Sequence, residues 1–127
     1  MAKLINAQLL VVDDIEINQI IAREILTDMG YIVDIAGNGQ EALDMLRRKD
    51  YDAILMDIQM PVLDGLTATV KIREEEKYKD LPIIALSAHA FIADKEKSLA
   101  HGMNDHITKP IDPDVLGATL QKWLRPA

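Results

Sequence analysis

The chain has 127 residues, a length that suits one compact domain, and 49% of them are apolar, which is enough for a sizeable core. The formal net charge of -7 argues against nonspecific nucleic-acid binding, and the lack of cysteine excludes disulfides and thiol chemistry. No apolar stretch is long enough to span a membrane and the N-terminus lacks a signal-peptide pattern, so we expect a cytoplasmic domain with no membrane contact.

Short apolar runs alternate with stretches of helical periodicity along the sequence. In chain order, the pattern predicts the strand Leu9–Val12, the helix Glu16–Met29, the strand Tyr31–Ala36, the helix Glu41–Arg48, the strand Ala53–Met56, the helix Leu66–Glu76, the strand Pro82–Leu86, the helix Ala90–Ala100, the strand His106–Thr108 and a last helix that starts at Pro113 with Asp112 as its N-cap.

Strands joined by helices of this length imply a parallel sheet with helices on both faces. We therefore expect an α/β protein of the flavodoxin-like (βα)5 class, with five parallel strands in the order 2-1-3-4-5. One domain should cover residues 1–127, with its core at about 8–124.

The first predicted helix has one arc of apolar residues and one apolar residue outside that arc. Ile20 falls among polar residues and is expected to be exposed. The residues predicted to face the sheet recur at helical spacing: Ile17, Ile21, Ile25 and Met29.

Residues able to do chemistry follow four of the five predicted strands: Asp13 and Asp14, Asp57, Ser87 and Lys109. The carboxyl ends of parallel strands share one edge of the sheet, so these residues should converge. Three carboxylates at one place repel one another unless a cation offsets their charge, and an all-oxygen site suits Mg2+. Because the hydroxyl and the ammonium can bind phosphoryl oxygens, the pattern predicts phosphoryl transfer to a reactive aspartate, Asp57.

Four motifs give the chain a resemblance to the receiver domain of response regulators in two-component signalling, from about Leu9 to Trp123. They are VVDD at 11–14, MDIQMPVLDG at 56–65, ALSA at 85–88 and KPI at 109–111. The run IEIN at 15–18 and the wording MDIQMP are most similar to receivers of hybrid sensor histidine kinases. Both a free-standing regulator and a receiver within a hybrid kinase fit this sequence.

The resemblance implies a role for each matching residue. Asp57 would accept a phosphoryl group from a phosphohistidine on a sensor histidine kinase or a histidine phosphotransfer protein. Asp14, Asp57 and the backbone carbonyl of Gln59 would bind Mg2+ directly, and Asp13 would act through a metal-bound water.

The resemblance also places Ser87, Ala88 and Lys109 around the bound phosphoryl group. The chain would act as a monomer or weak dimer, relaying or signalling the phosphoryl group and catalysing only its own phosphorylation and dephosphorylation.

Two positions depart from the usual receiver pattern. His106 stands where receivers carry Tyr or Phe, the ring that moves inward during switching, and we expect an imidazole to move less. Ile15 replaces a residue that is often polar, and with the exposed Ile20 it is a candidate contact for the phosphodonor.

Two other functions stay open at the level of the sequence. A Mg2+-dependent phosphatase or hydrolase would need a substrate pocket and a general acid or base, for which His89 is the one candidate. A docking module that is not phosphorylated would normally lack Asp14, Asp57 or Lys109, and this chain has all three.

Overall fold

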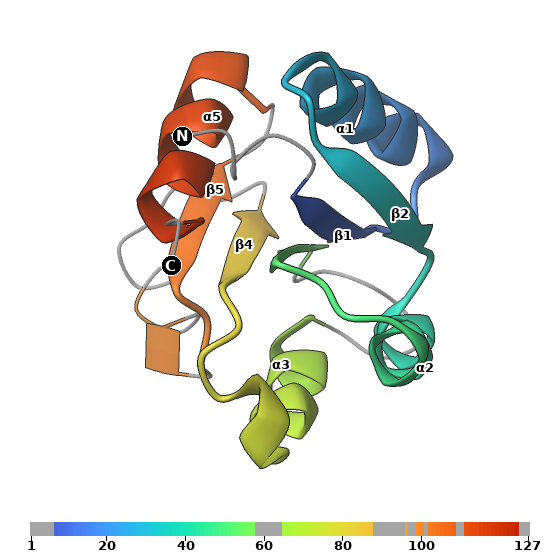
Figure 1. Ribbon diagram of the computed structural model, residues 1–127, viewed down its shortest axis with the longest axis vertical. Coiled ribbons are helices and arrows are strands. Elements are labelled where there is room, and N and C mark those ends of the chain that lie inside the picture. The colour runs from blue at the N-terminus through green and yellow to red at the C-terminus, as the bar shows by residue number, and fades with distance from the viewer. Residues whose placement is uncertain are drawn as a thin grey trace.

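The five strands of this protein form one parallel sheet (Figure 1). The structure is a computed structural model, and it describes residues 7–57, 65–87, 96, 99, 100, 102–108 and 111–124. Their order is β2-β1-β3-β4-β5, which confirms the predicted fold class. The strands are β1 (Gln8–Val12), β2 (Ile32–Ala36), β3 (Ala53–Asp57), β4 (Ile83–Ser87) and β5 (Asp105–Thr108).

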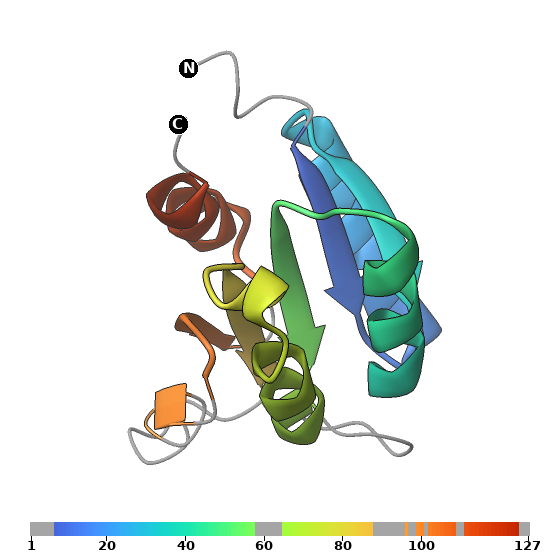
Figure 2. The same cartoon turned by 60° about the horizontal axis from the view of Figure 1, so that its bottom comes forward.

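The helices lie in two layers, one on each face of the sheet. They are α1 (Glu16–Asp28), α2 (Gly39–Arg48), α3 (Gly65–Arg73), the 3-10 helix η2 (Glu76–Tyr78) and α5 (Pro113–Trp123). In Figure 1, α1 and α5 lie above the sheet and α2 and α3 below it, and Figure 2 shows α1 behind the strands with α2 and α3 in front.

Side chains alternate along the central strands and thereby build two separate cores. Leu10 and Ile54 pack under α2 and α3, whereas Leu9 and Leu55 pack under α1 and α5. The central strands are buried on both faces, which explains their almost continuous apolar sequences.

Two strands end later than the sequence pattern predicts. β3 includes Asp57 and β4 includes Ser87, because the ladder pairs Asp57 with Leu86 and Ser87 with Thr108. Asp57 and Ser87 are therefore the last residues of regular strands, which fixes their backbones.

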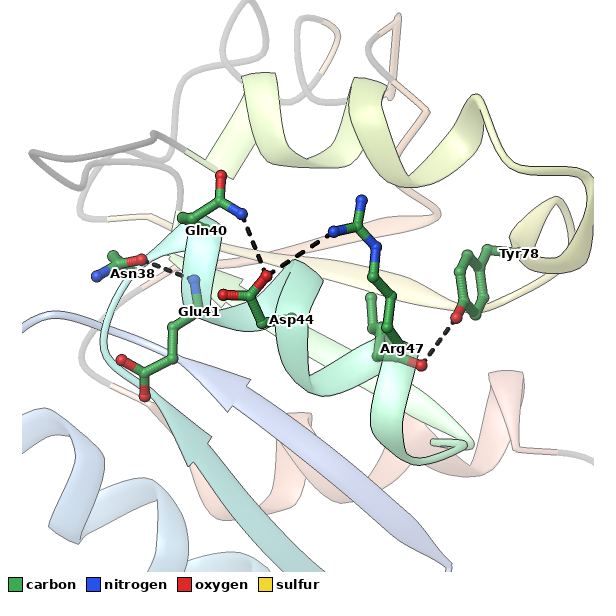
Figure 3. A network of polar contacts seen from close by, with 7 residues as sticks. Asn38, Gln40, Glu41, Asp44, Arg47 and Tyr78 are labelled. Carbon is green, nitrogen blue, oxygen red and sulfur yellow. Dashed lines mark hydrogen bonds and ion pairs between the residues drawn. The ribbon is translucent and has the colours of Figure 1, made fainter.

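The predicted third helix ends three residues early, at Arg73 instead of Glu76. The chain tightens there into η2, which places the Tyr78 ring in the core and its hydroxyl 2.8 Å from the carbonyl oxygen of Leu46 (Figure 3). Most of the predicted helix Ala90–Ala100 lies outside the described residues; Glu96, Leu99 and Ala100 are helical.

The inward face of α1 differs from the predicted one. Ala22 and Leu26 are fully buried, whereas Ile17 and Ile21 are 58% and 43% exposed. Ala22 and Leu26 are four residues apart and so share the side of the helix that packs on the sheet, whereas Ile17 and Ile21 lie outside that side. Of the predicted set, two residues do pack partly against the core, Ile25 and Met29.

Helix ends follow their sequence signals more closely. Asn38 caps α2 by accepting a hydrogen bond from the Glu41 N–H, as Figure 3 shows, and Asp112 caps α5 in the same way through Asp114. Gly30 follows the end of α1 at a φ of 95°, a conformation that glycine adopts without strain.

Candidate functional site

Three carboxylates meet at the carboxyl edge of the sheet, between β1 and β3. One oxygen from each of Asp13, Asp14 and Asp57 lies within 4.8 Å of the others. The register explains the proximity, because Val12 pairs with Met56 and the acidic residues follow directly on both strands. Asp13 and Asp57 are only 1% and 3% exposed, whereas Asp14 faces solvent.

The donor set fits Mg2+. All three groups offer carboxylate oxygens, the ligand type that hard divalent cations prefer. Two oxygens bound directly to one Mg2+ lie at most about 4.2 Å apart, twice the usual metal–oxygen distance. The three oxygens lie within 4.8 Å of one another, so the carboxylates are close enough to surround one ion.

The loop that carries Asp13 is held by hydrogen bonds to both of its backbone groups. The Asp13 N–H donates to the carbonyl oxygen of Ala36 at 3.1 Å, and the Asp13 carbonyl oxygen accepts from Nε2 of Gln19 at 2.6 Å. Its carboxylate Oδ1 also accepts from the Ile15 N–H at 3.0 Å. Sequence reasoning missed Gln19, which it placed only among the polar residues of the first helix.

Ser87 occupies the same edge, on the strand next to that of Asp57. It ends β4, is fully buried, and follows Leu86, the ladder partner of Asp57. The structure thus places Asp13, Asp57 and Ser87 on adjacent strand ends, as the sequence predicts. The predicted contributions of Gln59, Ala88 and Lys109 lie outside the described residues.

His106 lies in β5, half-buried and paired with Ala85 of β4. Its neighbour Ile107 packs into the core under α1 and α5, so the His106 ring faces the other side of the sheet. The preceding residue, Asp105, accepts the His106 N–H at Oδ1 and the Trp123 indole N–H at Oδ2. β5 is thereby tied to the end of α5.

Exposed isoleucines lie on the outer face of α1 and at its N-cap, which follows Asp14 directly. Ile15 is 49% exposed and Ile20 is 44% exposed, which confirms the predicted exposure of Ile20. With the misassigned Ile17 and Ile21 they form what we call the α1 isoleucine patch. The signal for a patch was present in the sequence, because four isoleucines within seven residues exceed what one buried arc of a helix can hold.

Across the described part of the chain, each helix is too short or too polar to cross a lipid bilayer.

Comparison with protein families gives one match over most of the chain. The family model of the response regulator receiver domain matches residues 9–121. The chain is 44% identical over 122 residues to hybrid signal transduction histidine kinase I of Dictyostelium discoideum, covering 91% of this chain and 7% of that protein. It is 39% identical over 119 residues to the sensor histidine kinase GacS of Pseudomonas protegens, covering 91% of this chain and 13% of that protein. The chain thus spans a small fraction of the relatives that it matches.

Solved structures agree with this match. The receiver domain of the sensor histidine kinase PA1611 from Pseudomonas aeruginosa, with a magnesium ion coordinated in its active site cleft, is 41% identical with a TM-score of 0.87, over 94% of this chain and 98% of that one. The receiver domain of Ssk1 from Saccharomyces cerevisiae, crystallised with the histidine phosphotransfer protein Ypd1, appears in a match with 34% identity and a TM-score of 0.86, over 93% of this chain and 88% of the matched chain. The fold, the acidic edge and the family match together show that this chain belongs to the response regulator receiver domains of two-component phosphorelays.

Proposed function

We propose that this chain takes a phosphoryl group from a phosphohistidine onto Asp57 in a Mg2+-dependent reaction. The observation that carries the proposal is the convergence of Asp13, Asp14 and Asp57 within 4.8 Å at one edge of the sheet. Asp57 is the nucleophile because, of the three carboxylates, it is the one that ends the buried central strand β3.

The reaction needs positioning and charge compensation more than covalent chemistry by the protein. A carboxylate oxygen of Asp57 bonds to phosphorus while the bond from phosphorus to the histidine nitrogen of the donor breaks. Bound Mg2+ supplies positive charge that offsets the repulsion between carboxylates and phosphoryl oxygens. Asp14, Asp57 and the Gln59 carbonyl would hold the ion, and Asp13 would hold one of its waters.

Two further side chains would stabilise the phosphoryl group. The Ser87 hydroxyl, at the neighbouring strand end, would donate a hydrogen bond to one phosphoryl oxygen. The ammonium group of Lys109 would pair with another, and Ala88 would border the group through its backbone.

The direct test is intact mass spectrometry after incubation with acetyl phosphate and Mg2+. The parent chain should gain the mass of one phosphoryl group, Asp57→Asn should gain none, and the exposed control Asp28→Asn should behave like the parent. Undiminished labelling of Asp57→Asn would overturn the assignment. A parent chain without labelling would instead favour the unphosphorylated docking module.

We further propose that the phosphodonor, a sensor histidine kinase or a histidine phosphotransfer protein, docks on the α1 isoleucine patch. Ile15 follows Asp14 directly as the N-cap of α1, and Ile20 lies within that helix, so a partner seated there would lie close to the acidic cluster. Exposed apolar residues clustered beside a reactive group are typical of a protein contact surface. The matched complex of Ypd1 with the Ssk1 receiver supports a partner of this class.

A further inference from the structure

The side chain of Gln19 reaches from α1 to the backbone of the acidic loop. Its Nε2 donates to the carbonyl oxygen of Asp13 at 2.6 Å, a short distance for a neutral amide hydrogen bond. The Gln19 N–H itself donates to the carbonyl oxygen of Ile15 at 3.1 Å, so the residue is fixed in the first turn of the helix. Gln19 is half-buried, which shields the bond from water.

The bond matters because of the peptide unit it holds. The Asp13 carbonyl and the Asp14 N–H belong to one planar group, so fixing the carbonyl fixes the plane that joins the two aspartates. The other side of Asp13 is fixed by its N–H bond to Ala36. With both sides of Asp13 restrained, the backbone positions from which the Asp13 and Asp14 side chains extend are fixed relative to each other.

We propose that Gln19 is a positioning residue for the metal site, which holds the Asp13–Asp14 peptide so that both carboxylates face the cation. The inference rests on the proposed function, since it assumes that Mg2+ binds at this cluster. Residues that orient metal ligands typically change metal affinity when they are replaced, although they never touch the ion.

A purely structural role makes a different prediction. Ile15, the N-cap residue of α1, makes no capping hydrogen bond with its side chain. In a purely structural role, Gln19 would do no more than hold the start of the helix in place of that cap. In that case its loss lowers the melting temperature of the metal-free protein and leaves the Kd for Mg2+ unchanged. If Gln19 positions the metal ligands, its loss instead raises the Kd for Mg2+.

The test titrates metal-free protein with Mg2+ by calorimetry, without any phosphodonor. Gln19→Met keeps the length and helix propensity of the side chain but removes the donor, and the Kd should rise roughly tenfold, the lower end of the usual range for such residues. The matched control is Gln40→Met, which removes an equivalent helix glutamine whose Nε2 donates to Asp44 Oδ1 at 3.3 Å (Figure 3). Its Kd should equal that of the parent.

A second variant and a spectroscopic signature sharpen the result. Gln19→Glu adds negative charge near the site, so attraction alone would tighten Mg2+ binding, whereas positioning predicts binding no tighter than in the parent. In metal-free protein, NMR should show shifts at the Asp13 carbonyl carbon and the Asp14 amide nitrogen in both variants. Equal Kd values for Gln19→Met and Gln40→Met, or tighter binding by Gln19→Glu, would overturn the proposal. Because no phosphodonor is present, either result is distinct from a failure of Asp57 to be phosphorylated.

Discussion

The two ends of the sheet gather charged and polar groups in opposite ways. At the amino end, the Arg73 guanidinium donates to the carbonyl oxygens of Tyr78 and Gly102 and to Oδ1 of Asn104, at 2.6, 2.9 and 2.6 Å. The same Asn104 oxygen accepts the Ile83 N–H at 2.9 Å. The positive charge of Arg73 at this end is therefore surrounded by oxygen atoms that accept its hydrogen bonds. At the carboxyl end, three acceptors of like charge are crowded together, which costs stability and creates a binding site.

Asp34, a carboxylate away from the acidic edge, also lies beside hydrogen-bond donors of the protein. Asp34 of β2 accepts from Lys49 Nζ at 2.9 Å and from the Tyr51 hydroxyl at 2.7 Å. The hydrogen bond from Lys49, and then that from Tyr51, holds the pKa of Asp34 below its usual value. Burial, together with the Asp34 charge, raises the pKa of Tyr51 above its ordinary 10.0. The comparison teaches that Asp34, a single structural carboxylate, has a cation and a hydroxyl beside it, whereas the acidic edge gathers three carboxylates at one place.

Removing Arg73 should produce the largest loss of stability. Arg73→Met leaves two backbone carbonyls and the Asn104 amide oxygen without their charged donor, so we expect unfolding to become easier by about 2 to 4 kcal/mol. Urea denaturation measures this. Arg47→Met is the control: its ion pair with Asp44, at 3.8 Å, is exposed, and its loss should cost less than about 0.5 kcal/mol. A Kd for Mg2+ that changed in Arg73→Met would show that the two ends are not independent.

A negative charge placed in the α1 isoleucine patch should slow transfer from the protein phosphodonor and leave the reactivity of Asp57 unchanged. Ile20→Asp is expected to lower the second-order rate of transfer from the cognate phosphohistidine protein roughly tenfold, the effect of losing one contact of moderate weight. Labelling by acetyl phosphate should be unchanged. Ile32→Asp, at 43% exposure on the amino end of β2, is the matched control and should leave both rates intact. Equal slowing of both reactions in Ile20→Asp would point to damage in the fold.

Neutralising one member of the acidic cluster should separate binding from stability. Asp14→Asn should bind Mg2+ more weakly, yet relief of repulsion should stabilise the metal-free protein by roughly 0.5 to 1 kcal/mol. Calorimetry with Mg2+ and thermal unfolding in chelator measure the two effects. Glu74→Gln, an exposed change of the same charge on the segment after α3, should alter neither. Mg2+ binding as tight as in the parent would refute the metal role of Asp14.

The smallest effect is expected at His106. An imidazole brings two polar nitrogens. Burying the neutral ring requires a hydrogen-bond partner and burying the charged ring costs more, so the inward movement is less favourable than for Phe or Tyr. NMR spectra of the free and beryllofluoride-bound protein should therefore show large changes near Asp57 and small ones along β5. Shifts at His106 as large as those beside Asp57 would show that the histidine switches fully.

The sequence predicts the functional edge well because strand ends are local features. Asp13, Asp57 and Ser87 each follow an apolar run, and the alternation of strands and helices brings those ends together. The predicted buried face of α1 was wrong because the pattern was drawn from large apolar residues alone, whereas the face that packs on the sheet includes the small Ala22. The Arg73–Asn104 bond joins residues 31 positions apart, so no local pattern indicates it. The bond from Gln19 to Asp13 depends on the path of the loop backbone, which only the fold defines.

The hydrogen bond between Trp123 and Asp105 gives the protein an optical reporter. Trp123 is the chain's one tryptophan, and its indole N–H lies 3.0 Å from a carboxylate whose other oxygen holds the backbone of His106. Indole emission is sensitive to the field of a nearby charge, so a displacement of β5 alters the colour or intensity of the emitted light. Fluorescence therefore follows the conformation of this strand in the unlabelled protein.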